Sequence, residues 1–148
     1  MIKVLFICHG NICRSPMAEF VMRALAEKAG AADRIEVASA ATSPEELGNP
    51  VYPPARKKLA AHGIACDGKH AVQMKRSDYA KYDHIFYMDA WNLRNILRIT
   101  GGDPDGKLHP LLETRDIADP WYTGDFDRAY DDILEGCKSW LPRLLKQR

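Results

Sequence analysis

The 148-residue sequence has little of several features that would assign it to a specialised class of protein. Its four cysteines are too few for a secreted scaffold held together by disulfides, so free or catalytic thiols are the better interpretation. Twenty-one basic and twenty acidic side chains nearly cancel, which argues against a general nucleic-acid or membrane-surface binder. No apolar run approaches membrane-spanning length. We therefore expect one domain, residues 1–148, in the cytoplasm, without nucleic-acid or membrane partners.

Short apolar runs alternate with segments of helical periodicity along the chain. The pattern predicts strands at 2–7, 35–40, 84–88 and 108–112, and helices at 16–29, 53–62, 89–99 and from 126 to at least 141. Residues 42–54 and 113–125 are the long loops. Such an alternation is typical of an α/β fold, so we expect a doubly wound, mostly parallel four-stranded sheet with helices on both faces. Functional residues are then expected in loops at the strand ends.

The loop of residues 8–15 carries the strongest chemical pattern. Cys8 ends an apolar strand, and Arg14 and Ser15 stand at the start of a helix that Ser15 could cap, with Pro16 at its first position. Between them, Gly10 and Asn11 tolerate unusual backbone angles. That geometry directs amide groups and a helix N-terminus at one point, which suits a bound phosphate and favours the thiolate form of a cysteine there.

Each residue of this loop also has an ordinary structural interpretation. A cysteine at a strand end is often a small buried apolar residue, and an arginine after a helix start is often solvated. At this spacing the functional interpretation is favoured: Cys8 is the nucleophile, and Arg14 grips two phosphoryl oxygens in the substrate and the transition state. Cys13 is either core filler or the partner of Cys8 in a reversible protective disulfide.

The segment Cys8 to Pro16, read as CHGNICRSP, resembles the signature of the low-molecular-weight protein tyrosine phosphatases. Further segments resemble the family in the same order, namely 39–42, 49–64, 83–92 with its Met88-Asp89 pair, and 119–122. The resemblance implies a phosphatase without a cofactor or metal that hydrolyses phosphotyrosine proteins or small aryl phosphates through a phosphocysteine intermediate. It also implies inhibition by inorganic phosphate or vanadate, and a phosphate-binding loop that consists of His9, Gly10, Asn11, Ile12, Cys13 and Ser15.

The leaving oxygen needs a proton donor, and a carboxylic acid on a mobile loop is the usual source. Composition leaves Asp116, Asp119 and Asp125 as candidates. The resemblance favours Asp119, which precedes Pro120 as in the family's acidic motif, and it places Trp121 and Tyr122 in the wall of the substrate pocket. Ser15 is expected to donate a hydrogen bond to the thiolate, Asn11 to hold the shape of the loop, and His9 to line the mouth.

Some residues depart from the family pattern or keep two interpretations. Asp89 resembles a family residue, but helix capping explains it nearly as well. Ala41 stands where many members have glycine, and Val72 where arginine is common, which leaves the alignment of the neighbouring His70 open. His70 therefore receives no role. The activity is still expected, because neither departure touches Cys8, Arg14 or Asp119.

Three other functions compete with the phosphotyrosine interpretation. An arsenate reductase on the same fold needs a further closely spaced cysteine pair, whereas Cys66 and Cys137 lie far apart in the sequence. A phosphoarginine phosphatase has threonine where this chain has the bulkier Ile12. The third is a zinc module that uses Cys8, Cys13, Cys66 and His70, whose spacing zinc would tolerate although the loop is an unusual zinc knuckle.

Overall fold

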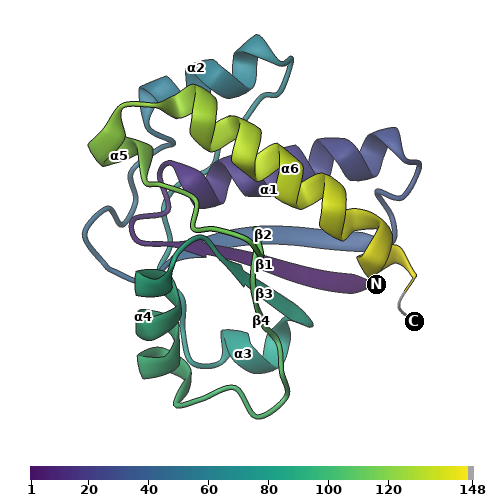
Figure 1. Ribbon diagram of the computed structural model, residues 1–148, viewed down its shortest axis with the longest axis vertical. Coiled ribbons are helices and arrows are strands. Elements are labelled where there is room, and N and C mark those ends of the chain that lie inside the picture. The colour runs from purple at the N-terminus through teal and green to yellow at the C-terminus, as the bar shows by residue number, and fades with distance from the viewer. Residues whose placement is uncertain (147–148) are drawn as a thin grey trace.

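The computed structural model describes residues 1–146 and shows a layered α/β architecture (Figure 1). The strands are β1 (Ile2–Cys8), β2 (Ile35–Ala41), β3 (His84–Tyr87) and β4 (Leu108–Pro110). The helices are α1 (Arg14–Lys28), α2 (Pro53–Ala61), α3 (Asp78–Lys81), α4 (Ala90–Thr100), α5 (Pro120–Thr123) and α6 (Phe126–Leu145). Within residues 1–146, no helix combines the length and the apolar character that crossing a bilayer demands.

The four strands form one sheet in the order β2-β1-β3-β4, and every pairing between them is parallel. The chain first moves from β1 to β2 on one side and later returns to β3 on the other side of β1. The carboxyl end of β1 is therefore the point where the winding direction reverses, which is where ligands bind in open α/β sheets. The predicted doubly wound sheet is confirmed.

Alternate side chains of β1 are buried on opposite faces of the sheet, as the period of a strand requires. Val4, Phe6 and Cys8 belong to the larger core, which includes residues of α1, α2 and α6. Leu5 and Ile7 join the smaller core with residues of β3 and α4. Figure 1 shows the same arrangement, with α1, α2 and α6 on one face of the sheet and α3 and α4 on the other. Because both faces are covered, β1 is apolar along most of its length.

Several element boundaries differ from the sequence-based prediction. β3 ends at Tyr87 because the amide of Met88 donates to Asn92 Oδ1 and not to a neighbouring strand. β4 covers only Leu108–Pro110, because the strand with which it pairs, β3, is itself short. The short helices α3 and α5 were not predicted, and α5 lies within the segment 113–125 that was expected to be a loop.

Candidate active site

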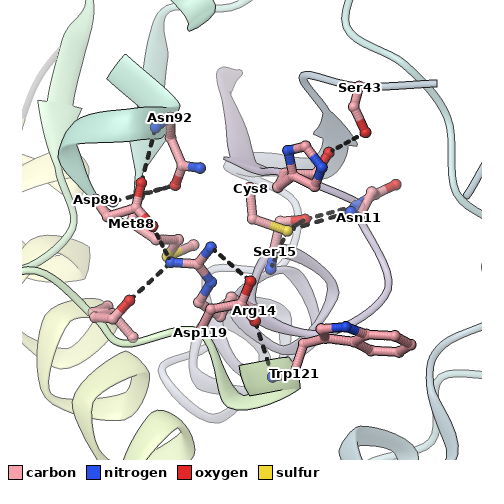
Figure 2. A network of polar contacts seen from close by, with 12 residues as sticks. Cys8, Asn11, Arg14, Ser15, Ser43, Met88, Asp89, Asn92, Asp119 and Trp121 are labelled. Atoms are coloured by element: carbon pink, nitrogen blue, oxygen red, sulfur yellow. Dashed lines mark hydrogen bonds and ion pairs between the residues drawn. The ribbon is translucent and has the colours of Figure 1, made fainter. Parts of the chain in front are cut away.

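The loop of residues 8–15 curls around the thiol of Cys8 at the end of β1 (Figure 2). The backbone amides of Asn11 and Ser15 donate hydrogen bonds to Cys8 Sγ, at 3.3 and 3.4 Å. Asn11 reaches this position with a φ of 61°, a left-handed conformation that asparagine tolerates better than most residues. Gly10 allows a close approach to the next loop, because a Cβ there would meet Glu46 Cγ at 3.2 Å. The loop therefore directs two backbone N–H groups at one point, an arrangement that binds anions.

Ser15 lies within the first turn of α1, and the expectation that it caps the helix is wrong. The helix begins at Arg14 with Cys13 as its N-cap residue, and no side-chain hydrogen bond caps it. Pro16 is accordingly the third helical residue and not the first. Because the helix starts earlier than predicted, the Ser15 hydroxyl turns back toward the loop and lies 3.0 Å from Cys8 Sγ.

A chain of buried hydrogen bonds continues from the sulfur into the protein. The Asn11 side-chain amide donates to Ser15 Oγ at 2.7 Å and to Ser39 Oγ at 2.9 Å. Ser39 in turn donates to Glu19 Oε1 at 2.5 Å. Ser15 Oγ accepts a hydrogen bond from Asn11, and its hydroxyl hydrogen is free to donate to Cys8 Sγ when the sulfur is a thiolate. The chain thus fixes the positions of Asn11 and Ser15 beneath the sulfur.

Arg14 is buried, and its guanidinium is held by acidic groups and a carbonyl from the far side of the site (Figure 2). Its Nη1 donates to Asp89 Oδ2 at 2.6 Å and to the carbonyl of Ile117 at 2.8 Å, and its Nη2 lies 3.4 Å from Asp119 Oδ2. Burial acts to lower the pKa of Arg14, but the negative charges of Cys8, Asp89 and Asp119 outweigh it and raise the pKa. Arg14 therefore stays charged at the site.

Asp119 is the N-cap residue of α5, and its Oδ1 accepts a hydrogen bond from the Trp121 amide at 3.0 Å. Its second oxygen, Oδ2, faces Arg14. Asp119 therefore caps α5 with one carboxylate oxygen and contacts Arg14 with the other. The two alternative carboxylates have other positions: Asp125 caps α6 through the Arg128 amide, and Asp116 lies at 3.5 Å from the Ala90 amide. Of these three carboxylates, Asp119 is the one that lines the pocket above Cys8.

Asp89 has both of the roles that the sequence left open. As N-cap residue of α4 it forms a capping box with Asn92, whose amide donates to Asp89 Oδ1 at 2.8 Å. The other oxygen of Asp89 is the one that binds Arg14. Asp89 therefore couples the start of α4 to the orientation of the guanidinium.

A pocket of about 100 Å³ opens above Cys8. Most of the predicted site residues line it, namely Cys8, His9, Gly10, Ile12, Cys13, Arg14, Asp119, Trp121 and Tyr122. Asn11 and Ser15 lie beneath it, in the hydrogen-bond chain. The ring of Trp121 rests 4.8 Å from that of Tyr52. The sequence did not point to Glu45 and Glu46, which also line the pocket, or to the contact of Glu45 with His9 at 3.2 Å.

Comparison with known proteins matches the chain along nearly its whole length. The model of a family described as low molecular weight phosphotyrosine protein phosphatase matches residues 3–148. The chain belongs to this family. The low molecular weight protein-tyrosine-phosphatase YfkJ of Bacillus subtilis is 36% identical over 154 residues, which cover 100% of this chain and 99% of YfkJ. PtpA of Staphylococcus aureus is 36% identical over 151 residues, 99% of this chain and 96% of PtpA.

Solved structures of family members share the fold closely. The crystal structure of YfkJ superposes with a TM-score of 0.94 at 37% identity, covering 99% of this chain and 96% of YfkJ. SP-PTP from Streptococcus pyogenes gives a TM-score of 0.90 at 39% identity, with 97% and 93% covered.

The two departures from the family pattern contribute to the site through their backbones. The Val72 amide donates to Asn11 Oδ1 at 3.1 Å, while much of its side chain faces solvent. Ala41 pairs with Cys8 in the sheet and exchanges hydrogen bonds with Val72 and Met74. A change of side chain at either position therefore leaves these contacts in place.

Sequence reasoning also missed Lys69 and Glu19, which lie beneath the site. Lys69 Nζ donates to the Ser39 carbonyl at 2.9 Å and lies 3.5 Å from Glu19 Oε1, and burial lowers the pKa of Lys69 although Glu19 acts to raise it. Arg23 binds the other Glu19 oxygen at 2.7 Å and donates to the Val37 carbonyl. His70, the neighbour considered from the sequence, is exposed and contacts the Gly68 carbonyl. The helical spacing of Glu19 from Ser15 was the available signal, because i and i+4 share one helix face.

Cys13 and Cys137 are buried thiols whose surroundings disfavour ionisation. All four cysteines are free thiols, so the Cys8–Cys13 disulfide stays a prediction. Burial raises the pKa of Cys13, an effect to which the adjacent Cys8 adds, and burial alone raises the pKa of Cys137. Among residues 1–146 no three His, Cys, Asp or Glu side chains are grouped so as to hold a metal.

Proposed function

We propose that this protein hydrolyses phosphotyrosine in proteins, or small aryl phosphates, through a phosphocysteine intermediate on Cys8. The observation that carries the proposal is the set of hydrogen bonds to Cys8 Sγ from two amides and the Ser15 hydroxyl, in a pocket shared with Arg14 and Asp119. A sulfur with these donors is suited to act as a nucleophile. Membership of the phosphatase family supports the same chemistry.

In the first step the thiolate of Cys8 attacks phosphorus, and the bond between phosphorus and the phenolic oxygen breaks. The phenolic oxygen leaves with the electron pair of that bond and takes a proton from Asp119. The loop amides and Arg14 bind the three remaining phosphoryl oxygens and stabilise their charge in the transition state. Arg14 is held by Asp89 in an orientation that lets it contact the pocket.

In the second step water attacks the phosphorus of the phosphocysteine. Asp119, now a carboxylate, accepts a proton from that water while the S–P bond breaks. Inorganic phosphate leaves, and Cys8 returns as a thiolate that the same hydrogen bonds stabilise. Free phosphate, and vanadate as its analogue, should therefore occupy the same pocket and inhibit the reaction.

The walls of the pocket favour a flat aromatic ester. Trp121 and Tyr122 provide ring surfaces at the mouth, and Ile12 adds an apolar side chain from the loop itself. A phosphoarginine substrate would bring a polar guanidino group against these surfaces. We therefore place phosphotyrosine ahead of phosphoarginine.

A panel of phosphopeptides tests the proposed function. With equal sequences that carry phosphotyrosine, phosphoserine or phosphoarginine, we expect hydrolysis of the phosphotyrosine peptide to exceed the others in kcat/KM by about 10² or more, since the acid and the aromatic walls both serve an aryl ester. Phosphate release is the measurement, with Cys8→Ser as the blank. A preference for phosphoarginine would overturn the substrate assignment and leave the nucleophile intact.

The hydrogen-bond chain behind Cys8 gives a further prediction. Ser39→Ala removes the link between Asn11 and Glu19, so the Asn11 amide loses an acceptor and its hold on Ser15 weakens. We expect kcat/KM for p-nitrophenyl phosphate to fall about tenfold, the worth of one buried hydrogen bond, and iodoacetate to alkylate Cys8 more slowly at pH 6. Ser77→Ala is the matched control, because Ser77 makes no side-chain capping hydrogen bond. Unchanged alkylation in Ser39→Ala would show that the chain does not act on the sulfur.

A further inference from the structure

A second groove lies beside the catalytic pocket, between the start of α4 and α5. Its volume is about 540 Å³, and it shares His9, Arg14, Asp119 and Tyr122 with the catalytic pocket. Figure 1 shows α5 and the first turn of α4 at the same end of the sheet, on opposite sides of it. A substrate bound over Cys8 would therefore extend directly into this groove.

Two aromatic side chains that are largely exposed to solvent line the groove. Trp91, on the first turn of α4, is 66% exposed, and Tyr122, on α5, is 82% exposed. Residues of this size are seldom left so exposed without a binding role when they lie together. The capping box of Asp89 and Asn92 fixes where α4 begins, so it holds Trp91 at the edge of the site.

The charged groups of the groove already have partners within the chain. Asp89 binds Arg14 and the Asn92 amide, and Asp119 binds the Trp121 amide and faces Arg14. The guanidinium of Arg94 lies over the Trp91 ring, 4.8 Å from its centre. The surface that remains for a ligand is mainly apolar; it includes the Trp91 and Tyr122 rings, with the polar side chains of His9 and Asn95 beside them. An apolar or aromatic side chain suits it better than a charged one, and an acidic one would approach two carboxylates.

We infer that this groove binds an apolar or aromatic side chain that neighbours the phosphotyrosine in a protein substrate, with Trp91 as the residue that determines this preference. The inference rests on the proposed function and adds a sequence preference to it. The rings of Trp91 and Tyr122 enclose the neighbouring side chain while the phosphotyrosine occupies the pocket above Cys8. Small aryl phosphates do not reach the groove and gain nothing from it.

Synthetic phosphotyrosine peptides test the inference. A reference peptide has glycine on both sides of the phosphotyrosine, and phenylalanine replaces glycine in turn at the two positions before and the two positions after it. We expect phenylalanine at one of these positions to raise kcat/KM of the wild-type enzyme about tenfold, the gain from burying a large part of one ring. Lysine or glutamate at the same position should give no such gain.

Variants of α4 assign the gain to the groove. Trp91→Ala should bring the ratio of the phenylalanine peptide to the glycine peptide close to one, and Trp91→Phe should retain most of it. Leu97→Ala, an exposed apolar change on the same helix, should leave the ratio unaltered. A ratio near one in the wild type, a stronger gain from lysine, or an undiminished ratio in Trp91→Ala would overturn the inference. If the wild type hydrolyses no phosphotyrosine peptide at all, the proposed function itself is wrong.

Discussion

Replacing Cys8 by serine is expected to abolish hydrolysis of every substrate while the protein still binds phosphate or vanadate. The serine hydroxyl is a poor nucleophile without a base to activate it. The anion-binding groups survive, because the amides of Asn11 and Ser15 and the guanidinium of Arg14 belong to other residues. Initial rates with p-nitrophenyl phosphate and titration calorimetry with phosphate measure the two properties separately.

The matched control for this experiment is Cys66→Ser. Cys66 lies after α2 and does not line the catalytic pocket, so its variant should keep most of the activity. Appreciable turnover by Cys8→Ser would exclude a phosphocysteine intermediate. Loss of phosphate binding together with turnover would instead show that the sulfur is needed to shape the loop.

Asp119→Ala is expected to slow hydrolysis of phosphotyrosine far more than hydrolysis of p-nitrophenyl phosphate. A nitrophenolate departs with little help, whereas the tyrosine phenolate, with a pKa of about 10 for its phenol, needs a proton as it leaves. General acids contribute about 10² to 10⁴ in rate, and we expect a loss in this range for the phosphotyrosine substrate. Both substrates are compared at one pH, because ionisation of the phosphate ester also alters the acidic limb of a pH profile.

A conservative variant, Asp119→Asn, separates proton donation from the structural role of Asp119. Its side-chain carbonyl oxygen can still accept the hydrogen bond from the Trp121 amide, as asparagine caps helices about as well as aspartate. The new side chain has no proton of the required acidity to give. Asp119→Asn should therefore share the leaving-group dependence of Asp119→Ala. If Asp119→Asn is active on both substrates, the carboxylate only positions the loop, and Asp116 becomes the next candidate.

The sequence predicted the fold because its local patterns and the fold agree. β1 is apolar and leads into a loop with Gly10 and Asn11, and the positive φ at Asn11 is where such a residue is needed. The alternation of strands and helices then leaves few alternatives to a parallel sheet. The short helices α3 and α5 were missed because four residues give no periodic pattern to detect.

The sequence predicted only the parts of the candidate site that belong to the loop of residues 8–15 and to the acidic motif at Asp119. Cys8, Arg14 and Asp119 line one pocket, and their catalytic roles stay predictions. Ser15 was predicted to cap the helix because a serine that precedes a proline is often an N-cap residue. In the structure α1 begins at Arg14, so Ser15 lies inside the helix. Lys69 and Glu19 could not be paired from the sequence, since fifty residues and a strand separate them and only the folded sheet brings them together.

The contacts beneath the site also bear on whether copies of the molecule can aggregate through the edge of the sheet. β2 is an edge strand, and an uncovered edge invites another chain to add a strand and begin aggregation. Here the Val37 carbonyl is occupied by Arg23 and the Ser39 carbonyl by Lys69, and Ala41 is bonded to residues 72 and 74. Lys69 therefore blocks strand addition at the same carbonyl group through which it supports the site.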